Sequence, residues 1–271
     1  MIKMVVADMD GTSLGLNEAI SEKNSATVKR VLESGREFLF ASGRPAFGML
    51  GLIKKAGLDD KIRYFIAYNG GIIHDIKEGK NLYVKKLDFN IIKEVYDIIM
   101  KNKIDISFCI HEKNLIYITQ DNEELEVEVS SNHQTKVFIK DINDYKDIDF
   151  MKILLVGKRE NLETAAAKLQ ESAVSNDIKT MFSLDFLLEV VPAGSDKSVA
   201  LKWFSEYSGI SLSEILSIGD GENDIEMLKE SGYSAAMQNA YEHVKKSADY
   251  VTEKDNNADG LTEAIEHFIK F

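Results

Sequence analysis

Short apolar runs alternate with segments of helical period at the start of the chain, and this alternation restricts the possible folds most strongly. The helical segments cover residues 21–34 and 45–56, and Gly35 and Gly57 follow them, as glycine often follows the last turn of a helix. The apolar runs around them are MVVAD, EFLFAS and YFIAYN. Repetition of strand, helix and strand predicts a parallel sheet with right-handed crossovers.

The same alternation returns near the end of the chain, in the runs LLEVV, EILSIGD, YSAAM and DYVT. Both flanks therefore belong to one domain, which we predict over residues 1–82 and 188–271. Residues 83–187 differ, since they indicate a small mixed sheet with helices on one face. They are predicted to form a second domain, inserted into a loop of the first, and a chain of 271 residues is long enough for two.

Polar side chains stand where three of the predicted parallel strands end. Asp8 and Asp10 follow MVVA, Ser42 follows FLFA, and Asp220 and Asp224 follow LSIG. A single acid there is as often a helix cap or a turn residue. Several together indicate a site, because open parallel sheets bind ligands beyond the carboxyl ends of their strands.

Four carboxylates at one sheet edge would repel one another, by roughly 4 kcal/mol per close pair at an effective dielectric constant of about 20. A divalent cation would relieve this repulsion. Hard oxygen ligands without a cluster of His or Cys favour Mg²⁺, which commonly takes its remaining ligands from water and from a substrate phosphate.

A lysine stands in the segment VVPAGSDKSVAL, in the predicted first turn of a helix. Backbone N–H groups and the positive end of the helix dipole favour anions at this place. Most lysines of this chain are best explained as surface residues, but Lys197 is also placed to bind a phosphate.

The chain contains four motifs that resemble those of the haloacid dehalogenase superfamily of aspartate-nucleophile phosphatases, in the same order along the sequence. The stretch DMDGT is similar to its first motif, ASGR to its second, Lys197 to its third and GDGENDIEML to its fourth. The insertion between the second and third motifs, and the stretch AYNGG, resemble the Cof-type subfamily, subclass IIB. The resemblance implies an α/β fold with a Rossmann-like parallel-sheet core and an inserted α/β cap domain.

The resemblance also implies a mechanism, that of a magnesium-dependent phosphatase. Asp8 would attack phosphorus to form an aspartyl-phosphate, while Asp10 would give a proton to the leaving oxygen and later take one from water. Mg²⁺ would be held by Asp8, by the backbone carbonyl of Asp10 and by Asp220, with Asp224 supporting the site.

Further residues would bind the phosphorylated substrate. Arg44 is expected to touch the leaving group. The groups expected to bind the phosphoryl group are Ser42, Lys197, Asn223 and the backbone donors around Met9 and Gly43.

Two positions depart from the pattern of the superfamily. Ser13 stands where the first motif usually continues with Leu, and Ser198 stands where Gly usually follows the lysine of the third motif. Neither removes a charged group. Thr12 is expected to be a structural hydroxyl, and Gly11 to permit a tight turn.

Three other features are expected to carry no chemistry. Residues 255–266, DNNADGLTEAIE, fit the spacing of a calcium-binding loop, but a strand-like segment precedes them where that motif needs a helix. Cys109 is the single cysteine and is expected to be a buried packing residue. His111 and His133 are expected to be solvated.

Charge and composition limit the partners. With 33 basic and 45 acidic residues the net charge is −12, which repels nucleic acid and anionic membranes. No apolar run approaches the ~18 residues of a membrane span, so the expected location is cytoplasmic. The expected partner is a small phosphorylated metabolite such as a sugar phosphate or a phosphorylated cofactor, and nothing indicates an oligomeric state.

Three alternatives share parts of this pattern. A phosphomutase would pass the phosphoryl group between positions of a sugar instead of to water. A signalling receiver also uses an acidic magnesium pocket, but it lacks the second Asp two places after the first and has no inserted domain. A regulator that binds phosphosugars without turnover would not need all of these acids.

Overall fold

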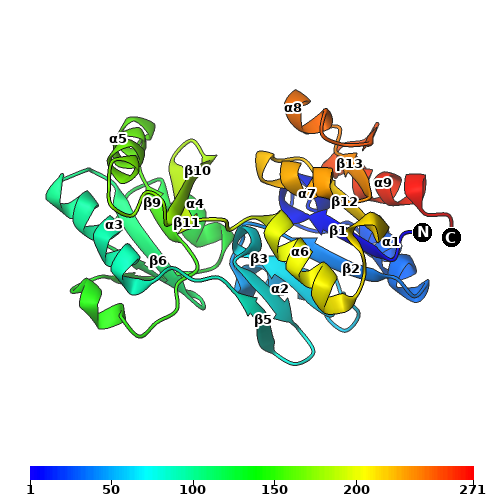
Figure 1. Cartoon of the computed structure of the whole chain (residues 1–271), viewed down its shortest axis with the longest axis horizontal. Helices are drawn as coiled ribbons and strands as arrows, with labels where there is room; N and C mark the ends of the chain where they lie inside the picture. Colours follow the sequence, from blue (N-terminus) through cyan, green and yellow to red (C-terminus); the bar gives the residue numbers. More distant parts are fainter. The chain divides into compact units, whose positions relative to one another are not determined.

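The computed structural model describes all 271 residues, and the chain divides into two compact units (Figure 1). The first unit comprises Met1–Tyr83 and Asp196–Phe271, and the second comprises Val84–Ser195. Both chain termini lie in the first unit (Figure 1). None of the helices combines the length and the apolar character that crossing a membrane requires.

The first unit is built on an eight-stranded sheet of order β14-β13-β12-β1-β2-β3-β4-β5. The six strands from β14 to β3 run parallel, and β4 pairs antiparallel with β3. Strands of both flanks of the sequence therefore share one sheet, and the predicted α/β fold is confirmed. The strands are β1 (Met4–Asp8), β2 (Glu37–Ala41), β3 (Tyr64–Ala67), β4 (Ile72–Asp75), β5 (Lys80–Val84), β12 (Ile215–Gly219), β13 (Tyr233–Ala236) and β14 (Tyr250–Val251).

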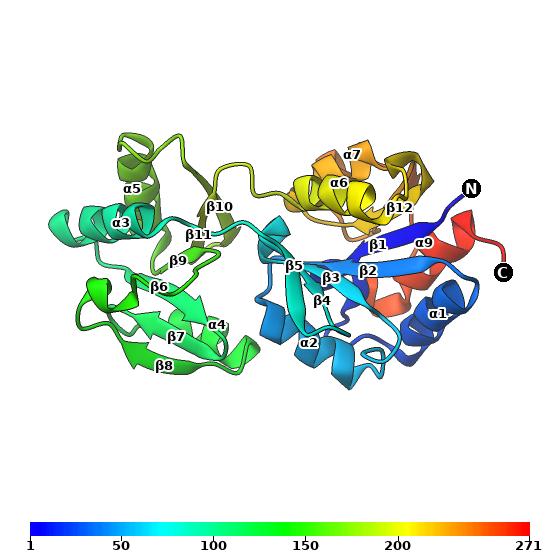
Figure 2. The same cartoon turned by 60° about the horizontal axis from the view of Figure 1, so that its bottom comes forward.

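Helices cover both faces of this sheet, α6 and α7 on one and α1, α2 and α9 on the other (Figure 2). The parallel strands β1, β3 and β12 are buried along their whole length, which explains their nearly continuous apolar sequence. The helices of the unit are α1 (Glu22–Glu33), α2 (Ala46–Lys55), α6 (Lys197–Ser208), α7 (Ile225–Glu230), α8 (Glu242–Lys245) and α9 (Gly260–Phe268).

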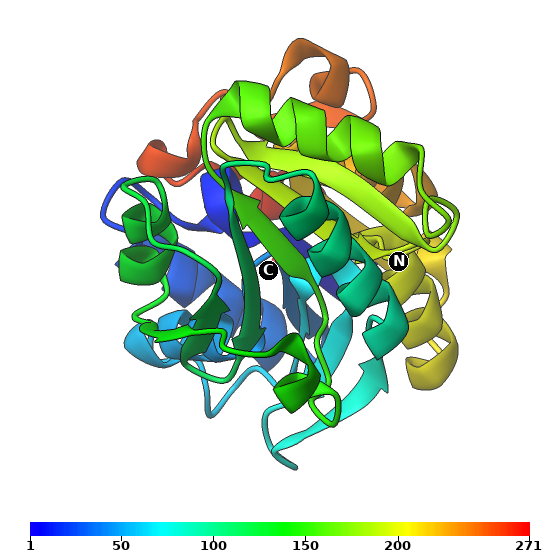
Figure 3. The same cartoon turned by 90° about the vertical axis from the view of Figure 1, so that its left-hand side faces the viewer.

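The second unit is built on a six-stranded sheet of order β10-β11-β9-β6-β7-β8, antiparallel except between β7 and β8. Helices α3 (Phe89–Lys101) and α5 (Arg159–Gln170) pack on one face (Figure 3). The strands are β6 (Ser107–Glu112), β7 (Leu115–Ile118), β8 (Thr135–Phe138), β9 (Ile153–Val156), β10 (Ile178–Leu184) and β11 (Leu187–Pro192).

One prediction about this unit is wrong, because its helices do not share one face of the sheet. Leu125 of the short helix α4 (Leu125–Ser131) packs with Cys109 and Leu154, whereas α3 and α5 pack with Phe108 and Leu155. Neighbouring residues of a strand point to opposite faces. The acidic helix therefore covers the second face through its few apolar residues.

The predicted return to the first domain at residue 188 is also wrong. Strand β11 lies between β9 and β10 in the second sheet, and the first unit resumes only at Asp196. All six residues of β11 are buried. A strand that is buried on both faces has the same apolar sequence in either sheet, so its pattern does not show which sheet it joins.

The start of α6 is fixed in two ways. The side chain of Asp196 caps the helix by accepting a hydrogen bond from the N–H of Ser198 at 2.8 Å. The backbone of the short turn η2 (Tyr68–Gly70) lies against it, since a Cβ atom on Gly70 would be 2.1 Å from the carbonyl oxygen of Asp196. Lys197 therefore begins the helix at a defined position.

Candidate active site

Asp8 is the last residue of β1 and is 4% exposed. It has the same direction as Met4 and Val6, which pack against α6, because alternate residues of a strand share a face. The next residues, Met9–Ser13, form the turn η1. The hydroxyl of Ser13 donates to the carbonyl oxygen of Asp8 at 2.5 Å. The unusual serine thus closes the turn onto the end of the strand.

Lys197, the first residue of α6, places its ammonium between two carboxylates. Nζ donates to Oδ1 of Asp8 at 2.5 Å and to Oδ1 of Asp224 at 2.7 Å. The side chain is fully buried. Lys197 is therefore not a surface lysine, and the structure brings together three residues from the first, third and fourth motifs.

Burial and charge act in opposite directions on this group. Burial alone would lower the pKa of Lys197, but the charges of Asp224 and Asp8 outweigh it, so this pKa is raised and the ammonium is kept. Burial raises the pKa of Asp8 well above its usual value, and the charges of the neighbouring acids add to this against the opposing effect of Lys197. Binding of a proton or a cation by the Asp8 carboxylate is therefore electrostatically favoured.

Asp220 follows β12 and lies against the turn after Asp8. The hydroxyl of Thr12 donates to Oδ1 of Asp220 at 2.7 Å. Gly11 has a positive φ of 78°, and a Cβ atom there would be 2.2 Å from Oδ2 of Asp220, so a larger residue would strain the backbone and displace this carboxylate. Burial raises the pKa of Asp220 to about 6, and the charges of Asp224 and Asp10 also raise it, whereas the Thr12 hydroxyl and Lys197 lower it.

These acids have the composition and spacing of a cation site. Carboxylate oxygens of Asp8, Asp220 and Asp224 all lie within 4.8 Å of one another. Asp224 uses Oδ1 for Lys197, and its Oδ2 accepts from the N–H groups of Asp220 and Gly221, each at 3.0 Å. Asp8 and Asp220 each retain an oxygen without a protein donor. This set of oxygen ligands fits a hard cation such as Mg²⁺, which the two remaining oxygens of Asp8 and Asp220 would hold, with Asp224 as their support.

Asp10 lies in the turn η1 and forms an ion pair with Arg44. Nε of Arg44 donates to both carboxylate oxygens of Asp10, at 2.9 and 3.0 Å, and Nη2 donates to Oδ1 at 2.7 Å. The hydroxyl of Ser42 donates to Oδ2 at 3.1 Å. The guanidinium of Arg44, which we expected at a leaving group, thus occupies the carboxylate of Asp10 in this structure.

Asn223 contacts a residue that the sequence did not place among the site residues. Its Nδ2 donates to Oδ1 of Asn69 at 2.9 Å, and the N–H of Asn69 donates to the carbonyl oxygen of Ser42 at 3.0 Å. A Cβ atom on Gly43 would lie 3.0 Å from Nδ2 of Asn69, so Gly43 lies close to the same amide. Asn69 follows β3, so the rule of polar residues at strand ends would have found it.

The remaining predicted residues have structural surroundings. The side chain of Met9 is fully buried, which leaves its backbone for any contact with a substrate. Burial raises the pKa of the Cys109 thiol to about 12, so this cysteine is a packing residue as expected. His111 is only 5% exposed, and the expectation that it is solvated is wrong.

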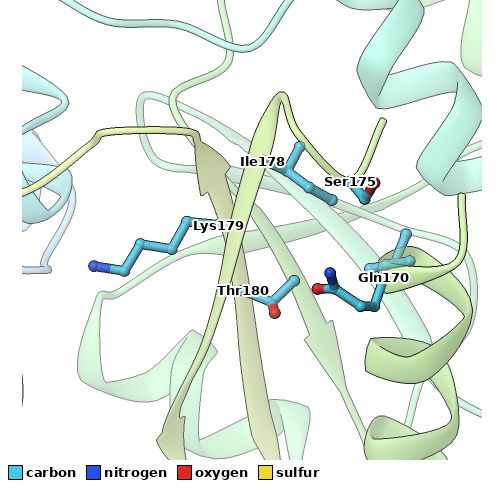
Figure 4. A pocket seen from close by; sticks show the side chains of 6 residues that line it. Gln170, Ser175, Ile178, Lys179 and Thr180 are labelled. Atoms are coloured by element: carbon cyan, nitrogen blue, oxygen red, sulfur yellow. The ribbon is translucent and has the colours of Figure 1, made fainter. Parts of the chain in front are cut away.

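A pocket of about 260 Å³ lies in the second unit, between the end of α5 and β10 (Figure 4). Its lining contains no acidic residue, and Lys179 points to the opposite side of β10 from Gln170 (Figure 4). This pocket therefore lacks the carboxylates that the acidic cluster would use to bind a cation.

Comparison with known proteins agrees with this geometry. The family model of haloacid dehalogenase-like hydrolases matches residues 5–265. The 5-amino-6-(5-phospho-D-ribitylamino)uracil phosphatase YcsE of Bacillus subtilis is 29% identical over 269 residues, which cover 99% of this chain and 96% of that protein.

Two solved structures are similar over nearly the whole chain. A haloacid dehalogenase-like hydrolase from Bacteroides thetaiotaomicron is 30% identical with a TM-score of 0.91, and covers 99% of this chain and 100% of its own. TM0651 from Thermotoga maritima is 29% identical with a TM-score of 0.88, and covers 100% of this chain and 99% of its own.

Proposed function

Because the chain belongs to the haloacid dehalogenase-like hydrolase family and is a phosphatase of that family, we propose that it hydrolyses a small phosphorylated metabolite with Mg²⁺. The reaction would pass through an aspartyl-phosphate on Asp8. The observation that carries this proposal is the buried contact of Lys197 with Asp8, beside Asp220 and Asp224. A buried nucleophile held by a cation at the end of a parallel strand is suited to phosphoryl transfer.

In the first step an oxygen of Asp8 attacks phosphorus, and the bond from phosphorus to the leaving oxygen breaks. Lys197 orients the Asp8 carboxylate through Oδ1, and its charge favours the anionic form that can attack. Bound Mg²⁺, held by Asp8, the carbonyl of Asp10 and Asp220, would supply positive charge for the phosphoryl oxygens. In the second step water attacks phosphorus, the bond from phosphorus to the Asp8 oxygen breaks, and inorganic phosphate and the free Asp8 carboxylate are released.

Asp10 moves the protons in both steps. It gives a proton to the leaving oxygen and then takes one from the attacking water, as one carboxyl group can do in turn. Arg44 and Ser42 hold both of its oxygens in this structure, so Arg44 has to withdraw before Asp10 can act. The withdrawn guanidinium is then available to the leaving group.

The phosphoryl group would be bound by the groups around Ser42. These groups would be the hydroxyl of Ser42, the ammonium of Lys197 and the amide of Asn223. Asn69 supports two of these residues, because it accepts from Nδ2 of Asn223 and donates its N–H to the carbonyl oxygen of Ser42. Backbone N–H groups of Met9 and Gly43 complete the expected set. Asn223 would have to turn its Nδ2 from Asn69 toward the phosphoryl oxygen.

We propose that the second unit is the cap that selects the leaving group. The name of YcsE describes a phosphorylated ribityl compound as its substrate, which is in the class of small phosphorylated metabolites that we propose here. The acidic net charge makes a nucleic-acid substrate unfavourable. A cytoplasmic location remains a prediction of the sequence.

The test is hydrolysis of an aryl phosphate by the full chain with and without Mg²⁺, followed by a panel of phosphorylated metabolites. We expect Asp8→Asn to abolish turnover and Asp10→Asn to slow it by about 10²–10⁴-fold. Chelation of Mg²⁺ should stop the reaction. Full activity of Asp8→Asn would remove this residue from the mechanism.

Product analysis separates this proposal from the alternatives. A phosphatase releases inorganic phosphate, whereas a phosphomutase returns an isomeric sugar phosphate. A single phosphorylation of Asp8 without turnover would indicate a phospho-acceptor. Binding of a sugar phosphate without either reaction would indicate a regulator.

A further inference from the structure

The stretch that resembles a calcium loop has another role in the structure. Oδ1 of Asp255 accepts hydrogen bonds from the N–H groups of Asn257 and Ala258, each at 2.9 Å. Oδ1 of Asp259 accepts from the hydroxyl of Ser21 at 2.5 Å. These acids therefore serve as helix-turn and interhelix acceptors, whereas the asparagines between them reach a different part of the chain.

Three asparagines from the C-terminal part of the chain hold the segment that follows Asp10, and we call them the asparagine clamp. Nδ2 of Asn239 donates to the carbonyl oxygen of Gly11 at 2.8 Å. Nδ2 of Asn256 donates to the carbonyl oxygen of Leu14 at 2.7 Å. Oδ1 of Asn257 accepts from the N–H of Leu16 at 2.8 Å. The asparagine clamp therefore binds the backbone of residues 11–16 at both ends and in the middle.

The amide orientation of Asn239 is fixed by its two partners. Nδ2 faces a carbonyl oxygen, and Oδ1 accepts from the N–H of Asn256 at 3.2 Å. A flipped amide would set oxygen against oxygen and nitrogen against nitrogen. The side chain of Asn239 thus links the Gly11 carbonyl to the backbone N–H of Asn256.

Gly11 is the point of this segment at which position matters for the acidic cluster. Its Cα faces Asp220 so closely that a Cβ atom would displace the carboxylate, and its neighbour Thr12 donates to the same carboxylate. A shift of the Gly11 peptide would therefore move both the contact surface and the hydrogen bond of Asp220. Leu16, five residues further along, has no such contact with this carboxylate.

We propose that Asn239 is a positioning residue that sets the Asp220 carboxylate for Mg²⁺ through Gly11 and Thr12, while Asn257 only tethers the far end of the segment. This inference deepens the proposed function and rests on it for the identity of the cation. Loss of a residue that orients a metal ligand typically costs about 10–100-fold in metal affinity or activity.

The first experiment is calorimetric titration of the full chain with Mg²⁺ alone. Asn239→Ala should weaken binding by about tenfold, whereas the matched variant Asn257→Ala should stay within about twofold of wild type. Each substitution removes one hydrogen bond from the same segment, so a general loosening would affect both. Equal losses in the two variants, or no loss in either, would overturn the proposal.

A second variant, Asn239→Asp, keeps the shape of the side chain and replaces the donor with an acceptor. Its added negative charge would by itself favour a cation, so weaker Mg²⁺ binding would report lost positioning. Binding as tight as in wild type would count against the role of the donor. The exposed position of Asn239 makes both variants compatible with folding.

Kinetics provide the second readout. At saturating Mg²⁺ we expect Asn239→Ala to lower kcat by about tenfold with KM nearly unchanged, because the amide of Asn239 is bonded to the backbones of Gly11 and Asn256. If the wild-type chain hydrolyses no phosphate ester, the proposed function fails, but the Mg²⁺ titrations still decide whether Asn239 positions Asp220. A change confined to KM would contradict the positioning role.

Discussion

A single ammonium shared by two carboxylates, with a third acid beside them, leaves an excess of negative charge around Asp8. Lys197 contacts Asp8 and Asp224, while Asp220 lies within the same cluster. Burial, together with the charges of the neighbouring acids, raises the pKa values of Asp8 and Asp220. The protein residues alone do not balance the charge, and a cation would do so.

Replacing Lys197 should therefore be costly. In Lys197→Met, Asp8 and Asp224 lose their common partner while remaining buried, and we expect a loss of about 3–5 kcal/mol in the free energy of unfolding. Urea unfolding measures it. Lys202→Met is the matched control on the same helix, since its contact with Glu230 is half exposed and should be worth less than about 1 kcal/mol. Similar losses in both variants would contradict the role of burial.

Alanine substitutions at two glycines distinguish the effect of backbone strain from the effect of a close contact with Asp220. Gly11 and Gly35 have φ values of 78° and 79°, but a Cβ atom on Gly35 would meet nothing within 4 Å. Ala at either place should cost about 1–2 kcal/mol of stability for its left-handed backbone. Only Gly11→Ala should also displace Asp220 and impair Mg²⁺ binding, which calorimetry would detect. Normal Mg²⁺ binding by Gly11→Ala would show that the turn can yield.

At the scale of single elements, the sequence predicted the residues at the ends of strands. It did not predict which distant residues form hydrogen bonds with the loops. Apolar runs followed by polar residues led to Asp8, Ser42 and Asp220, because strand periodicity and termination are local properties. Asn239 reaches Gly11 across 228 positions of sequence. An exposed asparagine in a turn has many possible partners, so no local pattern indicates this contact.

Strand β6 supplies a prediction about pH. Burial, with a smaller effect of the Lys152 charge, lowers the pKa of His111 well below its usual 6.5. The unfolded chain therefore binds a proton at a pH at which the folded chain does not. The stability that depends on neutral His111 should be complete above pH 6.5 and decrease as the pH falls through that value toward the lower pKa of the folded state.

Hydrogen exchange of the segment Ser107–Glu112 between pH 7 and 5 would measure this dependence, after correction for the intrinsic exchange rate. His111→Gln keeps a polar side chain next to Gln134 and should flatten the dependence. The control His133→Gln replaces an exposed histidine and should leave it unchanged. An unaltered profile in His111→Gln would exclude this histidine as the cause.

At the scale of the whole molecule, the sequence predicted two domains, one inserted into the other. It ended the inserted domain at residue 187, whereas the second unit ends at Ser195. The second unit has its own apolar cores, on both faces of its sheet. Apolar content and helix period indicate that such a core exists. They do not indicate which of two sheets takes a strand such as β11, because that depends on pairing between distant segments.

Two fragments test this boundary. Residues 84–195, expressed alone, should fold cooperatively, with an unfolding enthalpy of about 0.7 kcal/mol per residue near 60 °C. Residues 83–187, which follow the boundary predicted from sequence, lack most of β11 and leave β9 and β10 without their shared partner. Calorimetry and near-ultraviolet circular dichroism would compare them. Equal cooperativity in the two fragments would show that β11 is dispensable for the second unit.

The close contact between Gly70 and the start of α6 fixes the backbone at the point where the chain re-enters the first unit. The polypeptide enters the first unit at Asp196, one residue before Lys197. At this point the Asp196 carbonyl lies against the Gly70 backbone. Gly70, Lys197 and Asp8 all belong to the first unit, so the distance between Lys197 and Asp8 is set by contacts within that unit.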